Sequence, residues 1–268
     1  MAANIGAEFD RISEIYDTTR RAASDAEIKA VSSELSGCSI ILDVGVGTGR
    51  FAKPLSDLGF EIVGIDVSRK MMSKAREKGV RNLILADAHN MPFKDKSFDA
   101  SIIIHVLQLI PDWRNVEREM GRVTKSEVVA LLSNRQREWN KSPNNYSSIW
   151  MRYAQLREEM GYPIRRNRIM WQNEEEIRSE LPPMKLVKVS DEVVVMKIRD
   201  IITRFQEEAY PMLQDIPSDV HNEIIKKLLA STVNVDSNGE KMTSTIEDKQ
   251  IKRRIVEELA VWRPDQLR

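Results

Sequence analysis

The chain has 268 residues, with 41 Lys and Arg residues against 41 Asp and Glu residues, so its formal net charge is zero. This length predicts one large domain, or one domain with an added lobe. Balanced charge disfavours a protein that binds nucleic acid through a broad basic surface. One cysteine excludes an intramolecular disulfide framework, and three histidines without helical i, i+4 pairing disfavour a histidine-based metal site.

The sequence predicts a cytoplasmic protein with no membrane span. Its first residues lack the basic start and the following apolar stretch of a secretory leader. No apolar run approaches the ~20 residues that a membrane-spanning helix needs.

Residues 1–37 favour helix, because their apolar side chains recur at helical spacing. Ser24 followed by Glu27 predicts a capping box at the start of a helix, and Gly37 predicts the end of that helix.

From residue 39 onward, strands and helices alternate. Short apolar runs predict strands at residues 39–44, 61–65, 82–86, 98–104 and 127–132. Helical periodicity predicts helices at residues 49–58, 68–78 and 111–123. Such alternation implies right-handed crossovers, and therefore an α/β fold with a parallel, doubly wound sheet.

After residue 135 the alternation ends. Residues 136–183 favour helices and loops, residues 184–198 predict a strand, and residues 199–248 favour helix with a turn at 235–243. We interpret residues 1–135 as the N-terminal helices and the core, residues 184–198 as a core strand, and the other two segments as an added helical cap. The last segment, residues 249–268, suits helix or strand, and we expect it to return to the core sheet.

A glycine-rich turn follows the first predicted strand. Gly45, Gly47 and Gly49 stand at G-x-G-x-G spacing after Asp43, and glycines let the backbone approach a ligand closely. The spacing differs from the G-x-G-x-x-G of a turn that holds a pyrophosphate. A carboxylate at Asp43 would repel a pyrophosphate, so the turn favours a cationic ligand or one with an ammonium group.

Two further acidic residues end the next two predicted strands. Asp66 lies ~20 residues beyond the first glycine of the turn, where an acidic side chain accepts hydrogen bonds from ribose hydroxyls. Asp87 ends the third strand, where it can accept from an adenine amino group. Together with Asp43, these residues predict a site for an adenosine that carries a cationic tail.

Residues 39–133 resemble the class I S-adenosylmethionine-dependent methyltransferases, and within them the small-molecule branch that includes the ubiquinone and menaquinone biosynthesis type. The matching blocks, which follow the order and spacing of the family, are Tyr16-Asp17 with Arg20, residues 41–50, residues 64–68 with Met71, Met72 and Ala75, residues 86–100, and residues 105–123. The resemblance implies a Rossmann-like, doubly wound, mostly parallel seven-stranded sheet with an added helical cap. It also implies S-adenosylmethionine as the cofactor and S-adenosylhomocysteine as the product.

The resemblance assigns a role to each matching residue. Asp43, Gly45 and Gly47 would hold the ammonium and carboxylate groups of the methionine tail. Asp66 would bind the ribose, Val67 and Met71 would line the adenine, and Asp87 and Ala88 would fix the edge of the adenine. Tyr16 and Arg20 would close over the methionine end.

His105 follows the fourth strand, beside the expected place of methyl transfer. It can be a general base, a substrate contact or a hydrogen-bonded structural residue. Methyl transfer from a sulfonium needs mainly in-line positioning, and an acidic acceptor needs no base. Two positions depart from the family pattern: Gln108 stands where many relatives carry a second histidine, and residues 124–127 replace a usual Pro-Gly-Gly turn.

The sequence favours a methyltransferase that acts on a small molecule by direct displacement onto oxygen, nitrogen or carbon. An RNA or protein acceptor is an alternative, although residues 104–107 lack the Asn/Asp-Pro-Pro-aromatic block that resembles base-amino methylation. A non-catalytic regulator that binds S-adenosylmethionine is a further alternative. A monomer and a homodimer are both compatible with the sequence.

Overall fold

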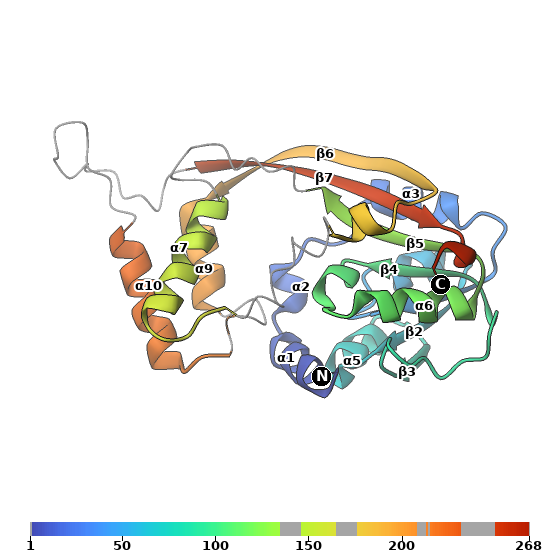
Figure 1. The fold of residues 1–268 in the computed structure, drawn as a ribbon, viewed down its shortest axis with the longest axis horizontal. Helices are drawn as coiled ribbons and strands as arrows, with labels where there is room; N and C mark the ends of the chain where they lie inside the picture. Colours follow the sequence, from blue (N-terminus) through green and yellow to red (C-terminus); the bar gives the residue numbers. More distant parts are fainter. Residues whose placement is uncertain are drawn as a thin grey trace. The chain divides into compact units, whose positions relative to one another are not determined.

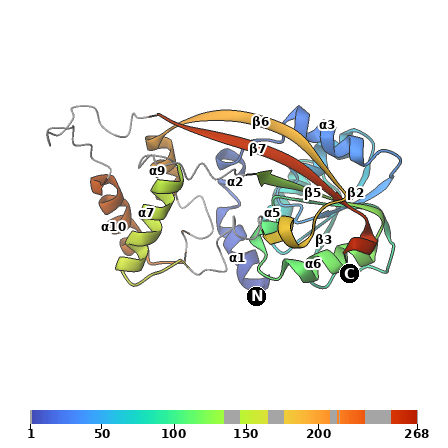
Figure 2. The same ribbon diagram turned by 45° about the horizontal axis from the view of Figure 1, so that its top comes forward.

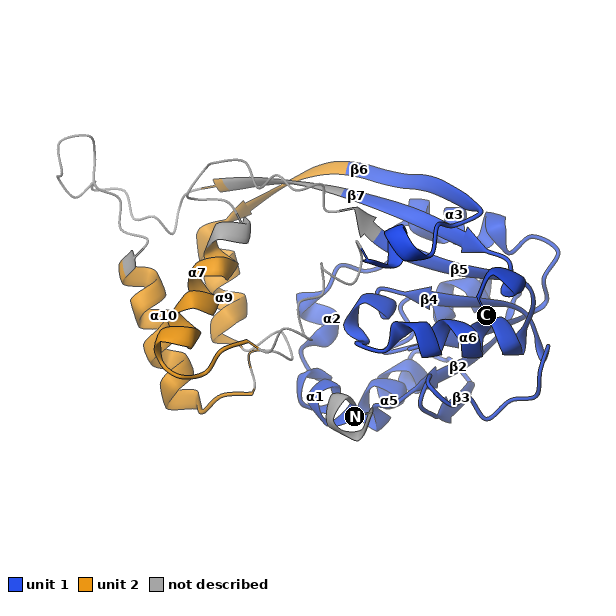
Figure 3. Cartoon of the chain, viewed as in Figure 1, with its two compact units in different colours: residues 1–134, 169–191, 256–268 blue, residues 135–168, 192–255 orange. Residues whose placement is uncertain are grey.

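The computed structural model of the chain describes residues 2–134, 146–164, 176–207, 213, 215–231 and 250–267. The chain divides into two compact units (Figure 3). Unit 1 comprises residues 1–134, 169–191 and 256–268, and unit 2 comprises residues 135–168 and 192–255. Each unit has its own hydrophobic core.

Three helices precede the sheet of unit 1: α1 (Ala2–Ile12), α2 (Tyr16–Thr19) and α3 (Asp25–Glu34). The predicted capping box begins α3. Ser24 Oγ accepts a hydrogen bond from the Glu27 backbone N–H at 3.3 Å, and the Glu27 carboxylate accepts one from the Ser24 backbone N–H at 2.6 Å. The backbone N–H groups of Ser24 and Glu27 thereby gain hydrogen-bond partners at the helix start, where the helix itself supplies none.

The sheet has seven strands in the order β3-β2-β1-β4-β5-β7-β6 (Figure 1). Their bounds are β1 Ile40–Val44, β2 Glu61–Asp66, β3 Asn82–Leu85, β4 Phe98–Ile104, β5 Thr124–Asn134, β6 Lys185–Lys197 and β7 Gln250–Trp262. The pairs β1–β2, β1–β4, β2–β3 and β4–β5 are parallel, whereas β7 runs antiparallel to β5. The predicted α/β fold with a mostly parallel seven-stranded sheet is confirmed.

Helices cover both faces of the parallel strands, as a doubly wound sheet requires. The crossover helices are α4 (Ala52–Asp57), α5 (Arg69–Glu77) and α6 (Trp113–Val123). Apolar residues of α6 pack with Leu42 and Val44 on one face, while those of α3, α4 and α5 pack with Ile41 on the other. Figure 2 shows α3 and α6 on opposite sides of the strands. Alternate residues of β1 therefore enter different cores, which is the period of two expected of a strand.

The ambiguous last segment is a strand, β7. It pairs with β5 from Val128 opposite Trp262 to Asn134 opposite Val256. Leu259 belongs to the core on one face of the sheet and Trp262 to the core on the other. Because both faces are covered, the strand shows no alternation of polar and apolar residues at this end, and its spacing also suited a helix.

The described part of unit 2 is mainly helical, and it also includes residues 192–197 of β6 and 250–255 of β7. It contains α7 (Tyr146–Glu159), α9 (Ile198–Gln206) and α10 (Ser218–Ser231). Buried His221 lies 2.8 Å from the Tyr153 hydroxyl and 2.8 Å from the Phe205 carbonyl oxygen, so its two ring nitrogens join the three helices. Residues 135–145, 165–175 and 232–249 of the predicted cap segments, including the predicted turn at 235–243, lie outside the described residues. The role of a cap stays a prediction.

In the described part of the chain, no helix is long and apolar enough to cross a membrane. The same residues include no group of three or more His, Cys, Asp or Glu side chains placed to hold a metal ion.

Gly121 lies in α6 beneath the C-terminal 3₁₀ turn, Pro264–Gln266. A Cβ atom there would lie 2.8 Å from the Leu267 carbonyl oxygen and 2.9 Å from the Pro264 carbonyl oxygen. We expect Gly121→Ala to lower the free energy of unfolding by ~1–3 kcal/mol in urea titrations, because backbone must move to admit the methyl group.

Arg118→Ala, at an exposed position of the same helix, is the control and should change stability by less than about 0.5 kcal/mol. Alanine is otherwise a better helix former than glycine by about 1 kcal/mol. A stabilised Gly121→Ala variant would therefore show that the turn does not press on α6.

Candidate functional site

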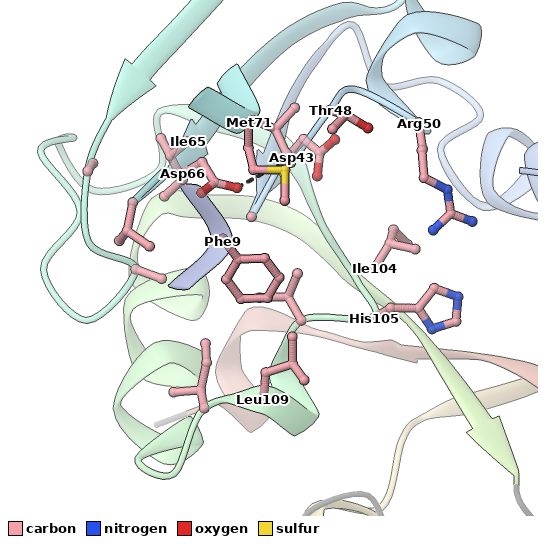
Figure 4. Close-up of a pocket in the computed structure, with 18 of the residues that line it drawn as sticks. Phe9, Asp43, Thr48, Arg50, Ile65, Asp66, Met71, Ile104, His105 and Leu109 are labelled. Carbon is pink, nitrogen blue, oxygen red and sulfur yellow. Dashed lines mark hydrogen bonds between the residues drawn. The ribbon is translucent and has the colours of Figure 1, made fainter. Parts of the chain in front are cut away.

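A pocket opens at the carboxyl ends of the central strands of unit 1 (Figure 4). Its volume is about 1050 Å³ including the open mouth. In doubly wound sheets, ligands bind at this edge, where the strand order reverses. Here the chain proceeds from β1 outward to β2 and β3, and then returns to β4 on the other side of β1. The lining residues are Phe9, Tyr16, Asp43, Gly45, Val46, Gly47, Thr48, Arg50, Phe51, Ile65, Asp66, Val67, Met71, Ala86, Asp87, Ala88, His89, Ile104, His105, Val106, Leu109 and Ile110.

The glycine turn between β1 and α4 forms the floor of the pocket. Gly45 has φ of 75° and Gly47 has φ of 55°, a left-handed conformation that L side chains rarely adopt. A Cβ atom on Gly45 would lie 2.6 Å from Val106 Cγ2. The turn can therefore pass directly against the loop after β4 only because this residue has no side chain.

Asp66 is held by two backbone N–H groups at the end of β2. Its Oδ2 atom accepts from Gly47 at 2.9 Å, and its Oδ1 atom accepts from Ser68 at 2.8 Å. Burial raises the pKa of Asp66 above its usual range, and these hydrogen bonds oppose that shift. The backbone bonds fix the direction of the carboxylate, and its remaining lone pairs are available to a ligand.

Asp43 is almost fully buried at the end of β1, with 3% of its surface exposed. Burial, and to a smaller extent the negative charge of Asp66, raise the pKa of Asp43 to about 7. The carboxyl group therefore takes up a proton near neutral pH. A cation placed beside it would favour the ionised form and drive the proton off.

Asp87 follows β3 and contacts His89. Its Oδ1 atom accepts from the His89 backbone N–H at 3.0 Å and lies 2.6 Å from His89 Nδ1. Burial raises the pKa of Asp87, but the hydrogen bonds and charge from His89 outweigh burial and hold it below the usual value. Asp87 is therefore ionised at neutral pH.

His105 is the first residue after β4, and it has φ of 56°. A left-handed conformation costs a non-glycine residue on the order of 1 kcal/mol, and such residues occur often at ligand sites. Figure 4 shows its imidazole on the side of the pocket where Arg50 also lies.

The N-terminal helices are tied to the rest of unit 1 by acidic side chains. Asp10 Oδ1 accepts from Ser68 Oγ at 2.6 Å and from the Lys70 backbone N–H at 3.0 Å. Asp17 accepts from Thr48 Oγ1 at 2.6 Å and pairs with Lys78 Nζ at 2.5 Å. Phe9 and Tyr16 directly precede these two aspartates in the chain, and both rings line the pocket.

All but one of the site residues predicted from the sequence line this pocket. Asp43, Gly45, Gly47, Asp66, Val67, Met71, Asp87, Ala88, His105 and Tyr16 all line the pocket. Arg20 is outside the lining, with its guanidinium carbon 5.4 Å from the centroid of the Tyr16 ring.

Sequence reasoning did not select several other lining residues. Thr48 and Arg50 belong to the glycine turn, and His89 follows Asp87 by two residues, so their positions next to selected residues were a usable signal. Phe9 reaches the pocket only because α1 docks on α5, which no local pattern indicates.

Comparison with known proteins places the chain in a family. Residues 42–132 match the model of a family described as "Methyltransferase domain". A demethylmenaquinone methyltransferase of Thermotoga maritima is 35% identical over 161 residues, which are 54% of this chain and 70% of that protein. An uncharacterised protein of Methanocaldococcus jannaschii is 35% identical over 122 residues, which are 44% of this chain and 56% of that protein. For several other curated relatives, the match spans about half of the relative's length.

A solved structure, the YcgJ protein of Bacillus subtilis, shares the fold with a TM-score of 0.50. The two chains are 17% identical, and the superposition covers 88% of this chain and 98% of that one. The glycine turn, the sheet order and these matches agree, and the chain belongs to the class I S-adenosylmethionine-dependent methyltransferases.

Proposed function

We propose that the protein transfers a methyl group from S-adenosylmethionine to a small-molecule acceptor by direct displacement. The observation that carries this proposal is the row of carboxylates Asp43, Asp66 and Asp87. Asp43 and Asp66 lie at the ends of β1 and β2, and Asp87 lies two residues beyond β3; all three line a single pocket beside the glycine turn. This arrangement suits a ligand with a ribose, an amino-substituted base and an ammonium group.

The residues present fit that cofactor. The free lone pairs of Asp66 can accept from the two ribose hydroxyls, because the backbone bonds already aim its oxygens. Val67 and Met71 offer apolar surface to the adenine, and Met71 is 1% exposed. Asp87 is ionised and lies where the adenine amino group would be. Asp43 is suited to the ammonium group, because a cation there offsets the free-energy cost of ionising a buried carboxyl group.

When bound, S-adenosylmethionine supplies an electrophilic methyl group on a cationic sulfonium. The protein's contribution is alignment and exclusion of water. Ile104, Val106, Leu109 and Ile110 form apolar walls near the end of β4. His105 is the titratable group among them, and we assign it the role of holding the acceptor's proton or hydrogen-bonding the acceptor.

The small-molecule class is supported by the Thermotoga maritima relative, whose name specifies demethylmenaquinone. It is also supported by the zero net charge of the chain, which gives no general attraction to RNA.

The acceptor class can be tested with methyl-labelled S-adenosylmethionine. A cell extract is divided into small-molecule, RNA and protein fractions, and each is incubated with the protein. We expect label to enter the small-molecule fraction only. Label in RNA or protein would contradict the proposed acceptor, and cofactor binding without transfer to any fraction would favour a non-catalytic regulator.

Asp66→Ala should weaken binding of S-adenosylhomocysteine by ~10-fold or more in calorimetry, because charge-assisted hydrogen bonds to the ribose are lost. Asp57→Ala, an exposed acidic position in α4, is the matched control and should leave the affinity unchanged. Equal affinities for Asp66→Ala and the unmodified protein would remove Asp66 from the cofactor site.

The pKa of Asp43 predicts a pH dependence of cofactor binding. Burial raises this pKa to about 7, and a bound ammonium group lowers it, so binding releases a proton from a carboxyl group that is protonated below pH 7. We expect the affinity for S-adenosylhomocysteine to fall about tenfold between pH 7.5 and pH 5.5.

Asp43→Asn cannot lose a proton at this position, so its weaker binding should vary much less with pH. The same pH profile for Asp43→Asn and the unmodified protein would show that another group sets the dependence.

A further inference from the structure

Arg50 is a charged side chain of the pocket with no role in the assignments above. It follows the last glycine of the turn and lines the pocket. Its Nε atom is buried and makes no hydrogen bond within the part of the chain that the structure describes. The guanidinium carbon lies 5.9 Å from the centroid of the Phe51 ring, which supports the group from one side.

Asp17 is an acidic side chain on which the charge of Arg50 acts, and it already has other partners. Burial raises the pKa of Asp17, but hydrogen bonds from Lys78 and Thr48, followed by the charges of Lys78 and Arg50, bring it below the usual value. The Asp17 oxygens are bound by Thr48 Oγ1 and Lys78 Nζ. Arg50 therefore acts on Asp17 through its field, while both Asp17 oxygens serve other donors.

A partly buried guanidinium without an anion is costly, and its forked donors match a carboxylate. Figure 4 shows Asp66 and Arg50 on opposite sides of the labelled set, with Asp43 between them in this view. The pocket is thus acidic where the adenosine would lie and basic at the other end. A ligand that presents an ammonium group to Asp43 and a carboxylate beyond it complements this order of charges.

We infer that Arg50 forms a carboxylate subsite, which binds the α-carboxylate of the methionine tail of the cofactor. The inference rests on the proposed function, because it takes the cofactor's place in the pocket from there. It gives Arg50 the position at the methionine end that the family resemblance had given to Arg20. It also makes Arg50 a specificity-determining residue, which separates S-adenosylmethionine from its decarboxylated form.

The test compares two ligands that differ in one group. S-adenosylhomocysteine and its analogue without the α-carboxylate are titrated into the unmodified protein, Arg50→Met and Arg50→Lys, with calorimetry as the readout. Arg50→Met should weaken S-adenosylhomocysteine by ~10-fold or more and the analogue by less than about twofold. Arg50→Lys keeps the charge without the fork, so its loss should be intermediate.

Arg20→Met is the matched control, because Arg20 contacts the Tyr16 ring and does not line the pocket. It should change the affinities for both ligands by the same factor. A urea titration of each variant separates loss of binding from loss of folding, and Arg50→Lys carries the test if Arg50→Met does not fold.

The inference is wrong if Arg50→Met weakens both ligands equally, weakens neither, or if Arg20→Met shows the carboxylate-selective loss instead. An unmodified protein that binds neither ligand would contradict the proposed function itself. An unmodified protein that binds both, with variants that do not discriminate between them, would contradict only the role of Arg50.

Discussion

The site depends on a close approach that only a residue without a side chain permits. Gly45 places the end of β1 directly against Val106 in the loop after β4, where a Cβ atom would lie 2.6 Å from a methyl carbon. The same turn offers the Gly47 N–H to Asp66 on β2. Three strand ends are thereby held in register by one stretch of backbone. The pocket is preorganised because its acidic groups are aimed by the main chain, which is less mobile than side chains.

The charged groups of the pocket are costly to bury. Burial and a neighbouring carboxylate raise the pKa of Asp43 to about 7, so this carboxyl group resists ionisation. On the opposite side, Arg50 Nε is buried without a hydrogen-bond acceptor in the described chain. A zwitterionic ligand would relieve both. The free energy of folding lost by burying these groups is thereby recovered as binding free energy, and it favours ligands that carry both charges.

Much of this fold follows from local sequence patterns. The five predicted core strands up to residue 132 and the capping box at Ser24 are confirmed. Buried strands appear in the sequence as short apolar runs, and a helix start appears as a capping pattern, so both have strong local signals. The last segment was ambiguous, since Leu259 and Trp262 satisfy helical spacing although they enter cores on opposite faces of β7. Only pairing with β5, more than a hundred residues earlier in the chain, decides between the two.

The residues of the site, too, could be predicted only in part from local sequence patterns. Asp43, Asp66 and Asp87 could be selected from sequence because each lies at or just beyond the end of a strand that the pattern had already located. Phe9 could not be predicted in this way. It reaches the pocket because Asp10 binds α1 to the start of α5, and no local pattern indicates that contact. Arg20 was selected from the family resemblance and lies outside the lining, whereas Arg50 was passed over within the same motif as the glycines. Local pattern locates the backbone of a site more reliably than the long side chains around it.

The pocket lining runs from Phe9 to Ile110, and every residue of it precedes unit 2 in the chain. Unit 2 is formed by two later segments, residues 135–168 and 192–255, and it has a core of its own. Substitutions, insertions or even replacement of those segments during evolution would leave every named pocket contact in place. The protein is therefore built so that one part of the chain can diversify while the other keeps its chemistry.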